Sequence, residues 1–196
     1  MDIKPALNVP PALRLRAQGR SADGSLGLRA AIFDVDGVLT DGRLYIGAEG
    51  EVVKAFSVLD GQGLKLLMVA GITPIVITGR DSPAVRRRML DLGLPHAAYG
   101  VHDKLSAAQT LLATLGLAWE QVAAIGDDWP DLPLLTRAAF AVAPPNAHVE
   151  VRAVVHHVTT ARGGEGAARE FCDILLAASG RYGALLRGAT GSLDAR

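Results

Sequence analysis

The stretch IFDVDGVLTDG, residues 32–42, decides the fold that this sequence predicts. Its first residues and the two alanines before them form a short, continuous apolar run, which is typical of a strand buried on both faces. The run leads directly into Asp34 and Asp36, and Gly37 then allows the chain to turn. Open α/β sheets bind ligands at the carboxyl ends of their strands, so this stretch predicts an acidic site at one edge of such a sheet.

Further short apolar runs recur along the chain: TPIVIT from residue 73, HAAY from 96, QVAAIG from 121, AAFAVA from 138 and AVVHHV from 153. Helix-like stretches separate them: GLKLLMVAG, SPAVRRRMLDLG, DKLSAAQTLLATLG, PDLPLLTRA and GEGAAREFCDILLAA. This alternation predicts βαβ units and an α/β fold with a doubly wound, Rossmann-like parallel sheet. After the first strand, RLYIGAEGEVVKAF carries two β-prone runs around residues 47–50, which predict a small β-hairpin.

Length and composition narrow the class of protein. The chain has 196 residues, of which 49% are hydrophobic and 20% charged, so it suits one packed domain rather than a disordered chain. The 20 basic and 20 acidic residues balance, which disfavours nucleic-acid and anionic-membrane partners. No apolar run reaches the roughly 18 residues of a membrane span. A single cysteine, Cys172, fits a reducing compartment, so we expect a cytoplasmic protein.

The composition also suggests how the chain is divided. Residues 1–28 are rich in Pro, Gly and Arg, and we expect a poorly ordered N-terminal arm with one short helix around residues 12–18. Residues 29–178 hold the alternating strands and helices and are predicted to form the domain. Residues 179–196 are rich in Gly and are predicted to form a flexible C-terminal tail.

Reactive side chains also follow the later strands. Thr78 ends the second strand, Lys104 opens a predicted helix, Asp127 and Asp128 end the strand from residue 121, and Asp131 follows one helical turn on. Taken singly, each has an ordinary explanation, because acids cap turns and helices and most lysines are solvated. Taken together, their repeated position at the edge of one sheet favours a functional site.

In chain order, an acid pair, a threonine, a lysine and a second acid pair resemble the four motifs of the haloacid dehalogenase-like phosphatase superfamily, over about residues 30–178. The strings DVDGVLTDG, KAFSVLDGQGLK, TGR, GDDWPDLP and GGEGAAREFCDILLAASG resemble its 3-deoxy-D-manno-octulosonate 8-phosphate phosphatase family. The resemblance implies a fold without a cap domain and a Mg²⁺-dependent phosphoric monoester hydrolase of lipopolysaccharide core synthesis. It also implies homotetramers in which a neighbouring subunit helps to close each site.

The resemblance implies a role for each motif. Asp34 would be the nucleophile that forms an aspartyl-phosphate, and Asp36 would protonate the leaving sugar alkoxide and then deprotonate the attacking water. Mg²⁺ would be held by Asp34, Asp127 and the backbone carbonyl of Asp36. Thr78 and Lys104 would bind the phosphate oxygens on which charge accumulates.

Substrate contacts of the family map onto a further set, and Asp128 and Asp131 are assigned to supporting the metal ligands or to capping. The expected substrate-binding residues are Asp36, Ser57, Asp60, Gly61, Lys65, Arg80, Arg88 and Lys104. Arginine suits a sugar acid because its guanidinium group binds a carboxylate through two hydrogen bonds. Arg88 also belongs to a run of three arginines that could form a solvated helix face. The family pattern is not matched at Ser57, Leu59, Lys65 and Glu165, which leaves nine-carbon sugar-acid phosphates as alternative substrates.

Other functions fit parts of the pattern. A broad small-molecule phosphatase would use the same chemistry. A signalling receiver domain uses similar residues, but its lysine comes last, whereas Lys104 precedes Asp127 and Asp128. A non-catalytic phosphosugar-binding protein would have no need for Asp36. Since the chain leaves little room for a lid, we expect another copy of it to supply one.

Overall fold

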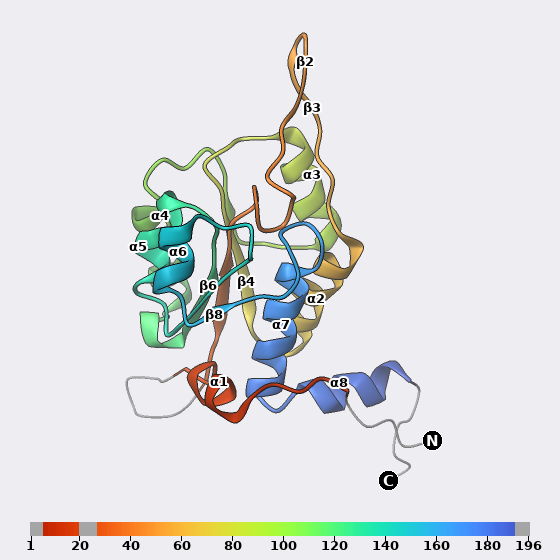
Figure 1. The fold of residues 1–196 in the computed structure, drawn as a ribbon, viewed down its shortest axis with the longest axis vertical. Helices are drawn as coiled ribbons and strands as arrows, with labels where there is room; N and C mark the ends of the chain where they lie inside the picture. Colours follow the sequence, from red (N-terminus) through yellow and green to blue (C-terminus); the bar gives the residue numbers. More distant parts are fainter. Residues whose placement is uncertain (1–5, 20–26, 191–196) are drawn as a thin grey trace.

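Six short strands form a parallel sheet in the order β5-β4-β1-β6-β7-β8 (Figure 1). The computed structural model describes residues 6–19 and 27–190. The strands of this sheet are β1 (Ala30–Phe33), β4 (Thr73–Ile77), β5 (Ala97–Ala98), β6 (Val122–Ile125), β7 (Phe140–Ala143) and β8 (His157–Val158). Every pairing in it is parallel, as the continuous apolar runs predict.

Helices cover both faces of the sheet, so the doubly wound α/β prediction is confirmed. On one face lie α2 (Val58–Val69), α3 (Pro83–Leu92) and α7 (Ala167–Ala178), and on the other lie α4 (Lys104–Leu115), α5 (Leu132–Leu135) and α6 (Val149–Val154). Two short 3-10 helices, η1 (Trp119–Gln121) and η2 (Trp129–Asp131), precede β6 and α5.

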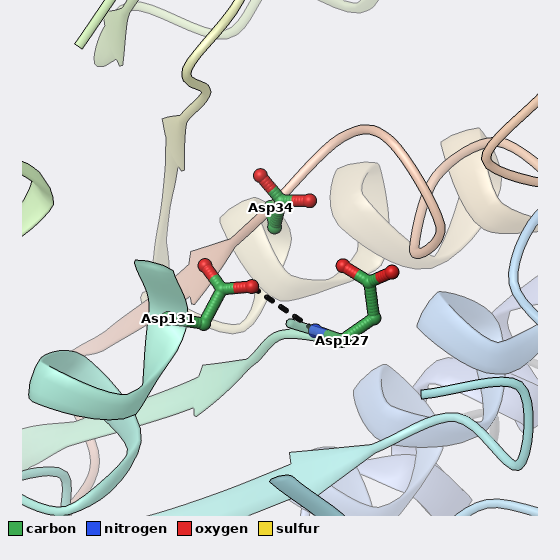
Figure 2. Close-up of side chains that lie close together, drawn as sticks. All are labelled: Asp34, Asp127 and Asp131. Atoms are coloured by element: carbon green, nitrogen blue, oxygen red, sulfur yellow. Dashed lines mark hydrogen bonds between the residues drawn. The ribbon is translucent and has the colours of Figure 1, made fainter. Parts of the chain in front are cut away.

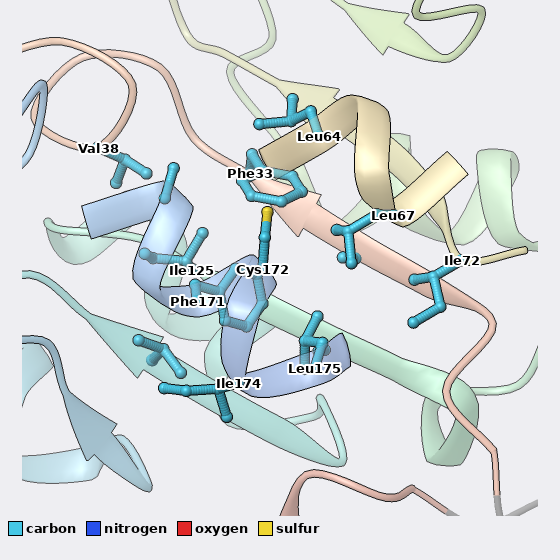
Figure 3. Packing of buried hydrophobic residues seen from close by; sticks show 14 of the residues in the cluster. Phe33, Val38, Leu64, Leu67, Ile72, Ile125, Phe171, Cys172, Ile174 and Leu175 are labelled. Atoms are coloured by element: carbon cyan, nitrogen blue, oxygen red, sulfur yellow. The ribbon is translucent and has the colours of Figure 1, made fainter. Parts of the chain in front are cut away.

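Strand β1 shows why the central runs are apolar at every position. Its residues belong in alternation to two separate cores, with Ala31 and Phe33 on the α2–α7 face and Ala30 and Ile32 on the α4–α5 face. Phe33 meets the Phe171 ring edge to face at a centroid distance of 5.4 Å, within the cluster that Figure 3 shows. Both faces of the strand are therefore committed to packing, and its chemistry is confined to the end.

The predicted hairpin is present as an antiparallel pair of β2 (Tyr45–Gly47) and β3 (Gly50–Val53). In Figure 1 it projects away from the body of the domain, beyond the carboxyl ends of the strands. Its exposed large apolar residues are Leu44, Tyr45, Ile46, Val52 and Val53. These side chains form an apolar surface on the hairpin that the rest of the described chain does not cover.

One predicted strand differs. The run AVVHHV was expected to be a strand, but α6 ends at Val154 and β8 holds only His157 and Val158. Short apolar runs do not separate a buried helix end from a strand, and here the run contains both.

Near the two ends, the described residues continue the fold. Helix α1 (Pro11–Arg16) lies close to the predicted short helix, and Val9 and Ala17 beside it are buried in the α2–α7 core. Helix α8 (Tyr182–Ala189) follows α7. Residues 1–5, 20–26 and 191–196, which belong to the predicted arm and tail, lie outside the described residues, and the predicted boundaries stay predictions. Within residues 6–19 and 27–190, no helix combines the length and the hydropathy needed to cross a bilayer.

Candidate active site

The three neighbouring strands β4, β1 and β6 end beside one another, and each delivers a predicted site residue. Asp34 follows β1, Thr78 follows β4, and Asp127 follows β6 after one glycine. A pocket of about 440 Å³ opens at this edge. Its lining includes the predicted residues Asp34, Asp36, Thr78, Arg80, Lys104, Asp127, Asp128 and Asp131. The structure therefore gathers these residues around one cavity.

Lys104 is the buried cation of the site. Its ammonium group donates hydrogen bonds to Oδ1 of Asp34 at 2.6 Å and to Oδ1 of Asp131 at 2.7 Å. Asp103 caps α4 by accepting from the backbone N–H of Ser106, which places Lys104 at the first position of the helix. Burial alone would lower the pKa of Lys104, but the two carboxylates outweigh it and raise that pKa above its ordinary value. Lys104 is therefore held in its charged form.

Three carboxyl groups face one another across the pocket floor (Figure 2). Asp34, Asp127 and Asp131 each offer an oxygen, and these oxygens all lie within 4.8 Å of one another. Burial, with the charge of Asp131 next, raises the pKa of Asp34 to about 7. Burial and the charge of Asp34 raise the pKa of Asp127 to about 8. One lysine does not balance three acids, so this set of hard oxygen donors fits a divalent cation such as Mg²⁺.

Asp131 organises the loop that carries Asp127. While Oδ1 binds Lys104, Oδ2 accepts from the backbone N–H groups of Asp127 at 3.1 Å and Asp128 at 3.3 Å. Gly126 permits this, since a Cβ there would lie 2.5 Å from the Asp131 side chain. Asp131 thus ties the lysine to the acidic loop.

The loop after β1 is held by the close approach of Gly37 to Asp127 and by a side-chain bridge to a second loop. Gly37 has φ of +98°, and a side chain there would clash with the Asp127 carboxylate. Asn146, which the sequence reasoning missed, bridges this loop to the glycine-rich segment before α7. Its Nδ2 donates to the carbonyl of Gly37 at 2.9 Å, and its Oδ1 accepts from the N–H of Gly163 at 2.8 Å. Nothing in its sequence surroundings indicated this bridge.

The hairpin supplies two further residues that sequence reasoning missed. Lys54, one residue beyond β3, donates to Oδ1 of Asp36 and lies 3.1 Å from Oε2 of Glu51. Glu51 in turn accepts from the Ser82 hydroxyl at 2.6 Å and lies 3.7 Å from the Arg80 guanidinium. Burial opposes ionisation of Glu51, but its bonds from Ser82 and Lys54 lower its pKa below the ordinary value. The hairpin is thereby joined to the pocket by alternating charges.

Thr78 and Arg80 differ in exposure at the pocket wall. Thr78 is buried, and its hydroxyl accepts from the backbone N–H of Arg80 at 3.3 Å. The Arg80 side chain is 47% exposed at the rim. Thr78 is therefore placed to contact a ligand on the pocket floor, and Arg80 one that extends outward.

The remaining predicted substrate residues lie apart from this pocket. Ser57 caps α2, and its carbonyl accepts from Arg88 at 3.3 Å, while Gly61 leaves room for that guanidinium. Asp60 is buried and accepts from the backbone N–H of Arg169 in the first turn of α7 at 2.7 Å. Burial raises the pKa of Asp60 to about 6. These residues surround a separate small hollow, and Lys65 is exposed on α2.

Known proteins that are similar to this chain in sequence point to one family. Residues 99–171 match the family described as haloacid dehalogenase-like hydrolase. The 3-deoxy-D-manno-octulosonate 8-phosphate phosphatase of Yersinia pestis is 44% identical over 164 residues, which cover 84% of this chain and 86% of the relative. The Haemophilus influenzae phosphatase of the same name is 44% identical over 154 residues, covering 79% of this chain and 86% of the relative.

A solved structure agrees with them. The 3-deoxy-D-manno-octulosonate 8-phosphate phosphatase of Moraxella catarrhalis, in complex with magnesium, phosphate and 3-deoxy-D-manno-octulosonate (KDO), superposes with a TM-score of 0.83 at 38% identity. The match covers 91% of this chain and 98% of that one. The chain therefore belongs to the 3-deoxy-D-manno-octulosonate 8-phosphate phosphatase family of the haloacid dehalogenase-like hydrolases.

Proposed function

We propose that this protein is a Mg²⁺-dependent phosphatase that releases phosphate from KDO 8-phosphate in lipopolysaccharide core synthesis. The observation that carries this proposal is the joint placement of Asp34, Asp36, Lys104 and Asp127 around one pocket at the strand ends. Relatives with the named activity share more than 40% of their residues with this chain over most of its length.

Asp34 is proposed as the nucleophile. Its carboxylate lies on the pocket floor, and the bond from Lys104 favours the ionised form that can attack phosphorus. Attack forms a bond between Asp34 and phosphorus and releases the sugar alkoxide. Water then attacks the phosphorus of the aspartyl-phosphate and frees both phosphate and Asp34.

Asp36 is proposed to move the protons. It would protonate the departing sugar oxygen in the first step and accept the proton of the attacking water in the second. The same carboxyl group can do both because the second step reverses the proton demand of the first. Thr78 and Lys104 are proposed to donate hydrogen bonds to the phosphate oxygens, on which negative charge accumulates.

The metal site is proposed to consist of Asp34, Asp127 and the backbone carbonyl of Asp36. When bound there, Mg²⁺ supplies positive charge that offsets the repulsion between Asp34 and the substrate phosphate. Asp131 would hold Asp127 in place from behind. Arg80 at the rim is proposed to bind the carboxylate of the sugar acid.

We also propose that the protein is a cytoplasmic homotetramer. The apolar hairpin surface supports self-association, because a patch of this kind is typical of an interface. The residues Ser57, Asp60, Gly61, Lys65 and Arg88 lie outside the pocket of their own chain, so a role for them in substrate binding would require an approach by a neighbouring copy. Sedimentation at assay concentration tests this, and a fully active, selective monomer would contradict it.

A panel of phosphate esters tests the proposed substrate. Purified protein with Mg²⁺ would be assayed for phosphate release from KDO 8-phosphate, a nine-carbon sugar-acid phosphate and a simple hexose phosphate, each with and without EDTA. We expect the highest kcat/KM with KDO 8-phosphate and loss of activity with EDTA. A higher kcat/KM for another ester would overturn the substrate assignment and leave the aspartyl-phosphate chemistry standing.

A further inference from the structure

Lys54 is a buried cation to which no role in the reaction has been given. Its side chain is 1% exposed although it lies at the base of a projecting hairpin. Its ammonium group contacts two carboxylates, those of Asp36 and Glu51. Burying an ammonium group is costly unless it is paired, and these two carboxylates provide the pairing.

The two contacts differ in what they join. Glu51 lies three residues earlier on the same hairpin, so the Glu51–Lys54 pair is local. Asp36 belongs to the loop after β1, 18 positions away, and its carboxyl group lines the pocket. The bond between Lys54 and Asp36 therefore connects the hairpin to the group proposed to move the protons.

The backbone and the side chain of Asp36 are held by different groups. In the loop that follows it, the Thr40 hydroxyl accepts from the N–H of Gly37 at 3.4 Å and donates to the carbonyl of Val35 at 3.3 Å. These bonds fix the backbone on both sides of Asp36 but leave its carboxyl group free to rotate. The ammonium group of Lys54 holds one carboxyl oxygen and so restricts that rotation.

We propose that Lys54 is a positioning residue, which holds the Asp36 carboxyl group in the orientation needed for proton transfer to the leaving oxygen. This inference rests on the proposed function, since it assumes that Asp36 acts as the acid. Lys54 does not line the pocket and acts through Asp36.

Glu51 completes the arrangement. It is anchored by the Ser82 hydroxyl beyond β4 and lies beside Arg80, so it gives Lys54 a second carboxylate partner that is itself held in place. A row of alternating charges, Asp36, Lys54, Glu51 and Arg80, thus runs from the proposed acid to the pocket rim. The hairpin would therefore orient the proposed acid as well as present an exposed apolar surface.

The test compares leaving groups. A sugar alkoxide needs a proton to depart, whereas p-nitrophenolate departs without one, and kcat/KM reports the steps up to this departure. We expect Lys54→Met to lower kcat/KM for KDO 8-phosphate by roughly 10- to 100-fold, below the full value of a general acid, and for p-nitrophenyl phosphate by less than about 3-fold. Lys54→Arg keeps the charge and should restore part of the loss. Equal losses on both substrates, or none, would overturn the proposal.

Two controls separate positioning from structural damage. Arg87→Met removes an exposed cation that pairs with Asp91 on α3, and it should change neither kcat/KM. Calorimetry should show unchanged Mg²⁺ affinity in Lys54→Met, because Asp36 is proposed to give the metal only its backbone carbonyl. A fall in Mg²⁺ affinity that matches the fall in activity would overturn the proposal.

Two further comparisons test the proposal if Lys54→Met does not fold or if the substrate assignment is wrong. If Lys54→Met does not fold, Glu51→Gln removes the charge that fixes Lys54, and it should give the same selective loss for the sugar phosphate at smaller size. A uniform loss in Glu51→Gln would overturn the proposal. If the wild-type protein prefers another alkyl phosphate, the substrate assignment fails, yet comparing that ester with p-nitrophenyl phosphate still tests Lys54.

Discussion

The ammonium group of Lys104 lies 2.6 Å from Oδ1 of Asp34, and both side chains are buried at the carboxyl edge of the sheet. The two residues are 70 positions apart in the chain, so the parallel topology brings them together. A second bond, to Asp131, ties the same lysine to the acidic loop after β6. Lys104 is therefore a candidate phosphate ligand, and its positive charge also reduces the repulsion among these buried acids.

Lys104→Met should be less stable than the wild-type protein because it leaves two buried carboxyl groups without their cation. We expect the free energy of unfolding to fall by about 3–5 kcal/mol in Mg²⁺-free buffer at neutral pH. Urea denaturation measures this, with Arg87→Met as the exposed control that should change by no more than about 0.5 kcal/mol. Equal free energies of unfolding for Lys104→Met and wild type would show that the bonds of Lys104 to Asp34 and Asp131 do not stabilise the fold.

Gly37→Ala should weaken metal binding, because its methyl group would displace the carboxylate of Asp127. We expect Mg²⁺ affinity to drop by roughly tenfold or more, which corresponds to about 1.4 kcal/mol. Gly71→Ala is the matched control, since Gly71 also has a positive φ, of +74°, but has open space around its Cβ position. The control should lose about 1 kcal/mol of stability and keep its Mg²⁺ affinity. Calorimetric titration distinguishes the two, and equal affinities would contradict the predicted clash.

Asp60 should make the stability of the fold depend on pH in a defined direction. Its pKa is raised from 3.8 to about 6 by burial, so between these values the folded protein binds more protons than the unfolded chain. Stability from this group is therefore present below about pH 4 and is lost as the pH rises through about 6. Asp60→Asn keeps an oxygen for the N–H of Arg169 and carries no charge.

The stability of Asp60→Asn relative to wild type should therefore increase by about 1–3 kcal/mol between about pH 4 and about pH 7. Denaturant unfolding of both proteins across that range measures the difference, and the titrations they share cancel. A stability difference that does not change with pH would show that burial does not raise the pKa of Asp60.

Much of the fold and part of the candidate site could be predicted from local sequence. Ala30–Phe33 is apolar at every position because both of its faces are packed, and this continuity indicates a parallel sheet. Asp34 and Thr78 were foreseeable because they directly follow strands that prove to be neighbours. In a parallel sheet, every residue that directly follows a strand lies at the carboxyl edge, so its position in the sequence is enough to predict that edge.

Other features depend on contacts that no local pattern encodes. Lys54 reaches Asp36 only because the hairpin returns to the loop after β1. Asn146 bridges two loops whose contacting residues lie 109 and 17 positions from it in the chain. The Asp60 carboxylate meets the start of α7, 109 positions later. Such contacts follow from how the helices pack on the sheet, so they become visible only in three dimensions.

The most direct test of the central claim is phosphate release from KDO 8-phosphate by wild type and Asp34→Asn at saturating Mg²⁺. Asparagine has nearly the same shape as aspartate but lacks the charged oxygen that would attack phosphorus. We expect rapid release by the wild-type protein and a fall of roughly a thousandfold or more in kcat for a folded Asp34→Asn variant. Release at the wild-type rate by that variant would contradict it.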